Sequence, residues 1–155
     1  MTGAACSSVL PTYSLVVQNF FLLGVRFRTQ SKMFERETIL VVDDDTEILA
    51  AATIRLKAAG YDTLTAADGQ AGVAAAEACQ PDGILMDVNM PVKDGITALK
   101  ELKSIDCTKD IPVVIMSAKE SNRQAAYDVG AHAFVKKPYQ GAKMVQAVID
   151  ALEAA

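Results

Sequence analysis

From residue 38 onward, two kinds of hydrophobic pattern alternate along the chain. Short continuous apolar runs are typical of strands buried on both faces, and longer segments with apolar residues at helical spacing favour amphipathic helices. The short runs predict five strands, at 38–43, 61–66, 82–87, 111–118 and 133–137. The longer segments predict five helices, at 46–59, 69–79, 95–105, 121–130 and 140–153.

Local signals at the helix ends agree with these bounds. Asp68 and Asp94 precede helices and can cap them, whereas Gly60 and Gly130 follow helices and can end them. The core face of the first helix is expected to carry Ile48, Leu49, Ala52, Leu56 and Ala59, and that of the last helix Val145, Val148, Ile149 and Leu152.

Strands that alternate with helices imply a parallel sheet with right-handed crossovers and helices on both faces. The predicted fold class is therefore α/β, a flavodoxin-like (βα)5 doubly wound sheet with strand order 2-1-3-4-5. No linker or repeat interrupts residues 38–155, which are expected to form one domain.

Residues 1–37 differ from this pattern and are expected to be an extension, disordered or produced by an upstream start codon. The apolar run at 13–25 is shorter than the roughly 20 residues that span a membrane. Basic residues follow this run, whereas a secretory signal has them in front. Met33 lies just before the first strand, so residues 1–32 are expected to be dispensable; a weak amphipathic membrane anchor is the alternative.

Composition narrows the class of protein further. The net charge of −4 argues against a basic nucleic-acid-binding surface and favours a cytoplasmic protein without stable membrane insertion. The three cysteines lie far apart without Cys-x-x-Cys spacing, so a disulfide framework or a zinc site is not expected. The single histidine, His132, excludes multi-histidine metal sites and is expected to be structural or exposed.

Polar residues lie at the carboxyl ends of four of the five predicted strands: Asp43, Asp44 and Asp45 at the first, Asp87 at the third, Ser117 at the fourth, and Lys136 and Lys137 at the fifth. In a parallel sheet these positions share one edge, where ligands bind, and strands one and three are neighbours. Clustered carboxylates stay ionised together when a cation lies among them, and hard oxygen ligands suit Mg²⁺.

Such an edge is suited to phosphoryl transfer. A metal ion neutralises the phosphoryl charge, while Lys137 and Ser117 can bind phosphoryl oxygens. A carboxylate at this position can attack phosphorus and form an acyl phosphate. Asp87 is the best candidate because it stands alone at the centre of the array.

Four segments, ILVVDDD, MDVNMPVKDG, IMSAK and FVKKPY, occur in the order and approximate spacing of the receiver domain of two-component response regulators. The chain resembles this family over about 38–155. By position, the resemblance implies Asp87 as phosphoacceptor and Lys137 as the family's lysine, which a cis Lys137–Pro138 bond aims at the site. It also implies Ser117 and Phe134 as switch residues, and Asp43, Asp44, Asp87 and the Asn89 backbone carbonyl as Mg²⁺ ligands.

The resemblance also implies partners. The phosphoryl group is expected to come from a sensor histidine kinase or histidine phosphotransfer protein, and the domain assists only its own phosphorylation and dephosphorylation, so it is not expected to be an enzyme. The surface of the fourth helix, fifth strand and fifth helix then changes. Because no output domain is seen on either side, we expect a stand-alone regulator that contacts a downstream protein and no nucleic acid.

Other interpretations stay open. The individual residues have ordinary structural roles available: Asp43 and Asp44 as solvated loop charge, Asp87 as a turn residue, Ser117 as a helix cap and Phe134 as core. Asp45 is expected to be a cap and Lys136 to be exposed. A magnesium-dependent aspartyl-phosphate hydrolase typically needs a second aspartate where Asn89 stands, and a nucleotide or flavin binder would need a Gly- or Ser/Thr-rich loop where the acidic DDDTE segment lies.

Overall fold

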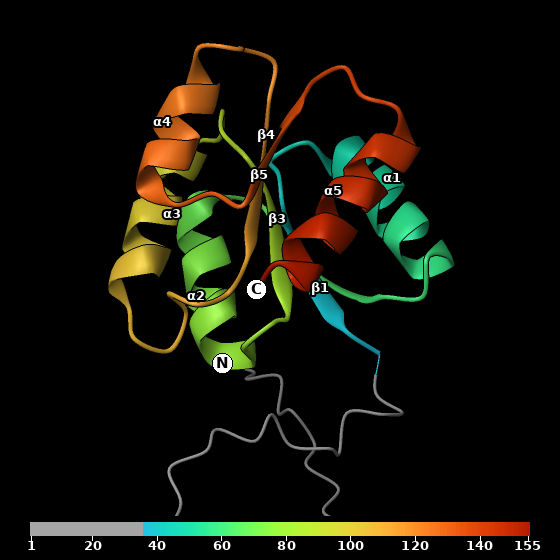
Figure 1. The fold of residues 1–155 in the computed structure, drawn as a ribbon, viewed down its shortest axis with the longest axis horizontal. Coiled ribbons are helices and arrows are strands. Elements are labelled where there is room, and N and C mark those ends of the chain that lie inside the picture. Colours follow the sequence, from blue (N-terminus) through green and yellow to red (C-terminus); the bar gives the residue numbers. More distant parts are fainter. Residues whose placement is uncertain (1–35) are drawn as a thin grey trace, which may run out of the picture. The chain divides into compact units, whose positions relative to one another are not determined.

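The computed structural model describes residues 36–155, which form five strands alternating with five helices (Figure 1). The strands are β1 (Thr38–Val42), β2 (Asp62–Ala66), β3 (Gly83–Asp87), β4 (Val113–Ser117) and β5 (Ala133–Lys136). The helices are α1 (Thr46–Ala58), α2 (Gly69–Cys79), α3 (Gly95–Ser104), α4 (Asn122–Val129) and α5 (Gly141–Glu153). All ten predicted elements are confirmed, with small differences at their ends.

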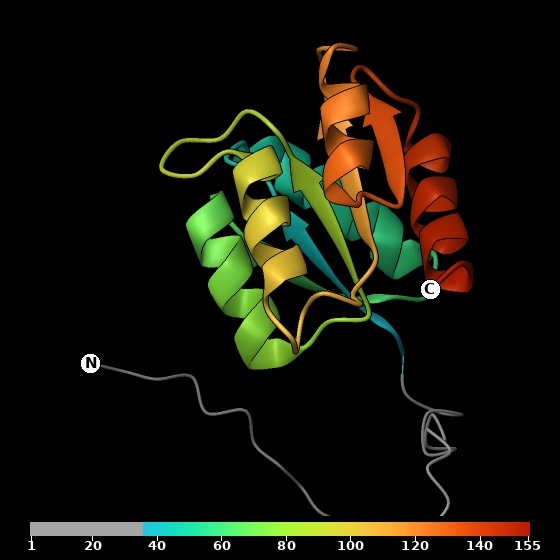
Figure 2. The ribbon, with the colours of Figure 1, turned by 60° about the vertical axis from the view of Figure 1, so that its left-hand side comes forward.

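The strands form one parallel sheet in the order β2-β1-β3-β4-β5, which confirms the predicted topology. Helices α2, α3 and α4 cover one face, and α1 and α5 cover the other (Figures 1 and 2). Each crossover connects strands that point the same way, so all the carboxyl ends of the strands reach one edge. β3 is the central strand of the sheet.

Alternation along each strand divides the core into two layers. Leu40 and Val42 pack on the side of α2, α3 and α4, whereas Ile39 and Val41 pack on the side of α1 and α5. All four side chains are fully buried. Because both faces of the sheet are covered, the inner strands read as continuous apolar runs.

Two predicted helix faces need correction. Ala59 is exposed, because α1 ends at Ala58 and Gly60 follows with a positive φ of 98°. In α5 the fully buried positions are Met144, Val148 and Ala151, while the other three predicted core residues, Val145, Ile149 and Leu152, are only partly buried. On this central line Met144 is flexible and Ala151 is small, so the helix can lie close to the sheet with Val145, Ile149 and Leu152 beside the contact.

The predicted caps are confirmed at three helices. Asp45, Asp68 and Asp94 each accept backbone N–H bonds from the first turn of the helix that follows. Asp94 has the most contacts, since it accepts from the backbone of Ile96 and Thr97 and from the Thr97 hydroxyl. These bonds satisfy donors that the helix itself leaves unpaired.

Replacing Asp94 with alanine is expected to lower the free energy of unfolding by about 1 kcal/mol, the usual value of an N-cap. Partial burial acts to raise the pKa of Asp94, but the hydrogen bonds from Thr97 and Ile96 outweigh it, and the pKa lies below 3.8. The contribution is therefore complete above pH 3.8 and is lost as the pH falls through the lower, folded-state pKa. Urea unfolding at pH 7 and below pH 3.8 measures both effects.

Gln140 provides the matched control, because it occupies the same position before α5 without a side-chain capping bond. Its replacement by alanine should leave the unfolding free energy within about 0.5 kcal/mol of the original. Equal losses at both positions would contradict the capping role of Asp94.

The predictions for residues 1–32 fall outside the described part of the chain. Within residues 36–155, no helix has both the length and the apolar character needed to cross a membrane.

Candidate functional site

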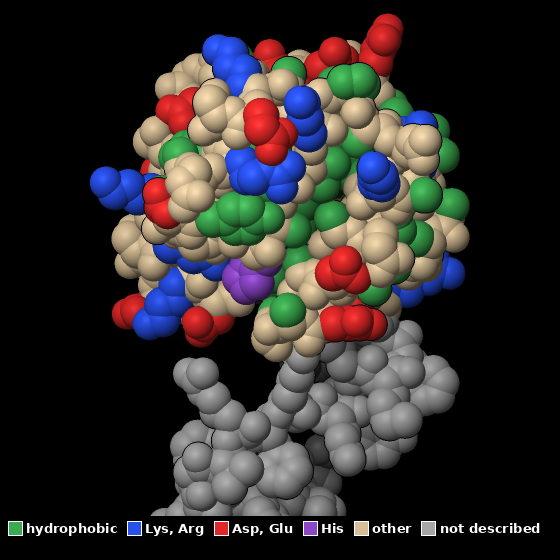
Figure 3. Space-filling view, turned by 45° about the horizontal axis from the view of Figure 1, so that its top comes forward, with side chains coloured by type: hydrophobic (Ala, Val, Ile, Leu, Met, Phe, Trp, Pro, Cys, Tyr) green, Lys and Arg blue, Asp and Glu red, His purple; other side chains and the backbone are tan. Residues whose placement is uncertain are grey.

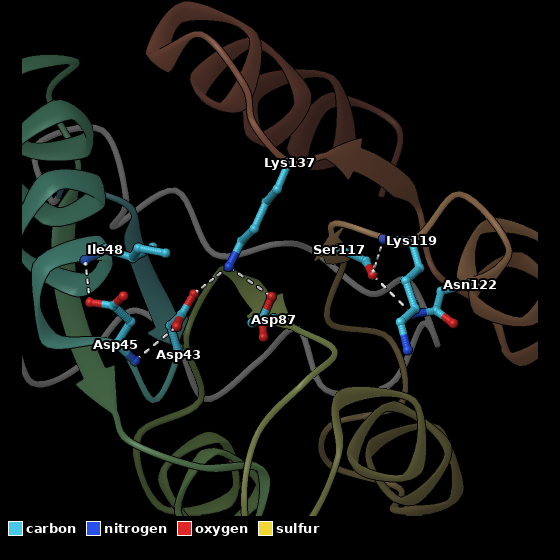
Figure 4. A network of polar contacts seen from close by, with 8 residues as sticks. All are labelled: Asp43, Asp45, Ile48, Asp87, Ser117, Lys119, Asn122 and Lys137. Atoms are coloured by element: carbon cyan, nitrogen blue, oxygen red, sulfur yellow. Dashed lines mark hydrogen bonds and ion pairs between the residues drawn. The ribbon is translucent and has the colours of Figure 1, made fainter.

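The predicted site residues lie at the carboxyl edge of the sheet (Figure 4). Asp43 directly follows β1, Asp87 is the last residue of β3, Ser117 is the last residue of β4, and Lys137 directly follows β5. Strands β1, β3, β4 and β5 are consecutive neighbours in the sheet. The parallel arrangement thus collects side chains that are up to 94 positions apart in sequence.

Lys137 lies between two carboxylates. Its Nζ atom is 2.8 Å from Asp87 Oδ1 and 2.9 Å from Asp43 Oδ2. Asp43 is also held from its other oxygen, since Oδ1 accepts the backbone N–H of Asp45 at 3.0 Å. The Lys137–Pro138 peptide bond is cis, as the resemblance implied. One ammonium group therefore joins the ends of β1 and β3.

Burial sets the electrostatics of this group. Asp43 and Asp87 are only 1% and 5% exposed. Burial raises the pKa of Asp87 above 3.8, and nearby Asp43 raises it too, whereas Lys137 and the backbone N–H of Asn89 lower it without cancelling the rise. Burial lowers the pKa of Lys137, but its two carboxylate partners outweigh this, so its pKa is raised. The positive charge of Lys137 therefore does not fully offset the effect of burial and of Asp43 on the pKa of Asp87.

Asp44 completes an acidic cluster with Asp43 and Asp87. One carboxylate oxygen from each lies within 4.8 Å of the others, and Asp44 is exposed while the other two are buried. Hard oxygen donors open to solvent on one side fit a magnesium ion that keeps several water ligands. The residues present therefore fit Mg²⁺, and these three aspartates would hold it. The backbone N–H of Asn89 donates to Asp87, and the role of the Asn89 carbonyl as a metal ligand stays a prediction.

The backbone behind Asp87 is fixed by Gly95. A Cβ atom at Gly95 would lie 2.1 Å from the Asp87 carbonyl oxygen, and the Gly95 N–H bonds to the Val88 carbonyl at 2.9 Å. The Asp94–Gly95 pair thus has two functions: Asp94 caps α3, and Gly95 lets the start of this helix approach the end of β3.

Ser117 is fully buried but its hydroxyl does not face Asp87. Its Oγ atom accepts the backbone N–H of Lys119 at 3.1 Å and the Asn122 side-chain amide at 2.9 Å. Figure 4 shows the oxygen turned toward these two residues. The helix cap of α4 is Ser121, so the alternative reading of Ser117 as that cap is wrong.

Phe134 lies in the core layer beneath α4, with 8% of its surface exposed. The guanidinium carbon of Arg123 is 4.8 Å from the centre of its ring, a cation–π distance. Lys136 is exposed, as predicted, and its Nζ atom lies 3.9 Å from Glu120 Oε2. His132 is also exposed, and its Nδ1 atom accepts the Val113 backbone N–H at 3.4 Å, which is a structural role.

Sequence reasoning missed Asn122 and Arg123. Each contacts one of the two predicted switch residues, Ser117 and Phe134. No sequence signal identifies them, because polar residues at the start of an exposed helix are common. Their contacts with Ser117 and Phe134 arise because the first turn of α4 packs beside the end of β4 and beside β5.

Comparison with known proteins agrees with this geometry. The family model described as the response regulator receiver domain matches residues 39–149. Over 112 residues the chain is 38% identical to the transcriptional regulatory protein PrrA of Mycobacterium tuberculosis, covering 71% of this chain and 47% of PrrA. It is 35% identical to the phosphate regulon transcriptional regulatory protein PhoB of Pseudomonas aeruginosa, covering 70% and 48%. The chain thus spans about half the length of these relatives.

Solved structures show the same fold. The chemotaxis response regulator CheY4 of Vibrio cholerae is 30% identical with a TM-score of 0.70, over 74% of this chain and 98% of that one. The receiver domain of a sensor histidine kinase from Pseudomonas aeruginosa, solved with a magnesium ion coordinated in its active-site cleft, is 26% identical with a TM-score of 0.71, over 77% and 99%. With its sheet order, acidic edge and matching family model taken together, the chain belongs to the response regulator receiver domain family of two-component phosphorelay signalling.

Proposed function

We propose that Asp87 accepts a phosphoryl group and that the domain relays this signal by changing a protein-binding surface. The observation that supports this most directly is the buried bridge from Lys137 to Asp87 and Asp43, beside the exposed Asp44. A nucleophilic carboxylate, a lysine ammonium group and the carboxylate oxygens that suit a magnesium ion therefore lie next to one another. Phosphoryl transfer needs little more than such positioning and charge neutralisation.

Asp87 is the acceptor in this proposal. It ends the central strand, keeps 5% of its surface exposed, and bonds to Lys137 through Oδ1. A carboxylate oxygen of Asp87 attacks the phosphorus of a phosphohistidine on the donor protein, the P–N bond breaks, and the imidazole leaves with its electron pair. Attack of water on the acyl phosphate later releases inorganic phosphate and restores the carboxylate.

The other residues neutralise charge. Lys137 binds one phosphoryl oxygen, and the Ser117 hydroxyl donates to another after it turns toward Asp87. When bound by Asp43, Asp44 and Asp87, together with the Asn89 carbonyl, Mg²⁺ supplies further charge neutralisation at the phosphoryl group. The domain in this role is a phosphoacceptor regulator and does not turn over a separate substrate.

The donor in this proposal is a sensor histidine kinase or a histidine phosphotransfer protein in the cytoplasm. The output surface is the face of α4, β5 and α5, where Figure 3 shows an apolar hollow bordered by lysine and arginine side chains. The groove on this face is lined by four basic residues, Arg123, Lys136, Lys137 and Lys143, and one acidic residue, Asp150. This balance suits a downstream protein segment with apolar and acidic side chains.

The relatives PrrA and PhoB, of which this chain spans about half, bear on the expected absence of nucleic-acid binding. They are named transcriptional regulators, so they lend no support to the expectation that this chain avoids DNA. The charge of the chain is the observation that favours protein contact, since its net charge is −4. We assign the receiver function to residues 38–155 and treat residues 1–32 as dispensable for it.

Intact-protein mass after incubation with acetyl phosphate tests the proposal. One phosphoryl adduct per chain is expected with Mg²⁺, and at least tenfold less after the metal is removed with a chelator. Replacing Asp44 with asparagine should weaken Mg²⁺ binding and so raise the metal concentration that the reaction requires. Lack of an adduct from acetyl phosphate and from a phosphorylated histidine kinase would overturn the assignment.

A further inference from the structure

The first turn of α4 is bound to the end of β4 by a side chain and has no side-chain cap of its own. Its cap residue, Ser121, makes no side-chain capping bond and has helical backbone angles, with φ −59° and ψ −22°. Instead, the next residue, Asn122, sends its side chain back to the Ser117 hydroxyl at the end of β4. The contact spans five positions and connects the start of the helix to the edge of the sheet that carries Asp87.

The bonds to Ser117 explain its orientation. Both the Lys119 N–H and the Asn122 amide donate to Oγ, so each uses a lone pair of the hydroxyl. The Lys119 contact is local to the turn, whereas the Asn122 contact ties the hydroxyl to α4. Because Ser117 is fully buried, water does not readily replace a lost partner.

We infer that Asn122 is a positioning residue that holds the Ser117 hydroxyl away from Asp87 and so sets the resting balance of the switch. The inference rests on the proposed phosphoacceptor function. To donate to a phosphoryl oxygen on Asp87, the hydroxyl must turn, and turning breaks the Asn122 bond. The phosphorylated state therefore forms at the expense of one partly buried hydrogen bond that is specific to the resting state.

The neighbouring side chain acts on the second predicted switch residue. Arg123 lies over the Phe134 ring and also pairs with Glu120, which lies near Lys136. Consecutive residues of one helical turn thus contact both Ser117 and Phe134. Release of Asn122 from Ser117 frees the turn that also covers the aromatic ring, which couples the hydroxyl to the surface of α4 and β5.

Binding of beryllium fluoride with Mg²⁺ to the full chain tests this inference, because the complex imitates a phosphoryl group without turnover. Asn122→Ala is expected to bind it about fivefold more tightly than the original protein, which corresponds to one hydrogen bond of about 1 kcal/mol. Asn122→Gln keeps an amide and should restore most of the original affinity. Gln124→Ala is the matched control, since that amide bonds to Asp128 on the same helix.

A double-mutant cycle separates positioning from a merely structural role. On a Ser117→Ala background, the further change of Asn122 to alanine should alter affinity by less than about 1.5-fold, because no hydroxyl remains to be held. In the metal-free single variant, the backbone amide resonance of Lys119 should shift, since it shares the same oxygen. Thermal unfolding of each variant shows whether it is folded.

Three outcomes would count against the inference. Equal affinities of the original protein and Asn122→Ala would overturn the role of Asn122 alone. A fivefold gain that persists on the Ser117→Ala background would also overturn it, because the effect would not pass through the hydroxyl. Failure of every folded variant to bind beryllium fluoride would overturn the proposed phosphoacceptor site as well.

Discussion

Replacing Asp87 with asparagine is expected to abolish the phosphoryl adduct completely. The two side chains have nearly the same shape, so the fold should persist, but the amide oxygen is not a nucleophile for phosphorus. Asp43 is not expected to take over, because both of its carboxylate oxygens have partners, Oδ2 with Lys137 and Oδ1 with the backbone N–H of Asp45. Intact mass after acetyl phosphate and Mg²⁺ should therefore show no phosphorylated species above background.

Asp106 offers a matched control for this substitution. Its side chain is 96% exposed and pairs with Lys109 outside the site, so Asp106→Asn should be phosphorylated as fully as the original protein. Peptide mapping of the original adduct should place the phosphate on the segment that contains Asp87. An adduct of undiminished size on Asp87→Asn would show that another residue is the acceptor.

The second large effect concerns the backbone that supports the acceptor. Gly95→Ala would introduce a Cβ atom 2.1 Å from the Asp87 carbonyl oxygen and 3.0 Å from Val88 Cα. Both neighbours are backbone atoms, so β3 or α3 has to move, and overpacking of this kind costs about 3 kcal/mol. We expect the melting temperature to fall by about 10 °C, as measured by circular dichroism.

Gly60→Ala is the control for the loss of glycine itself. Gly60 has a φ of 98°, and apart from its chain neighbours no atom of residues 36–155 lies within 4 Å of its Cβ position. Alanine there would have a strained backbone but no steric clash. A loss of about 1 kcal/mol is expected there, about one third of the effect at Gly95. If both variants melted at the same temperature, the close approach behind Asp87 would not contribute to stability.

The sequence alone was sufficient for the architecture because strong local signals agree with one another. Continuous apolar strands require a sheet covered on both faces, and a strand that alternates with a helix requires parallel pairing. Aspartates at 45, 68 and 94 cap helices through contacts within four residues, so their role is visible in the sequence. The elements therefore followed from local chemistry, apart from their last residues.

Part of the site could be predicted from the sequence in the same way. Once the strands are parallel, Asp43, Asp87 and Lys137 must reach one edge, whatever the details of packing. The helix faces were harder to predict, since a wide apolar stripe on α5 fits several rotations about its axis. Only packing against β3, β4 and β5 selects Met144 and Ala151 as fully buried positions over Ile149 and Leu152.

What only the tertiary structure decided is which partner each polar side chain takes. Lys137 is 94 positions from Asp43, and no local pattern says that one ammonium joins two buried carboxylates and leaves the pKa of Asp87 raised. Likewise, the turn of the Ser117 hydroxyl toward Asn122 depends on where α4 begins relative to β4. Sequence determined the fold and the residues at its reactive edge through short-range chemistry, whereas their charge balance and orientation arise from long-range contacts that form only when the sheet is assembled.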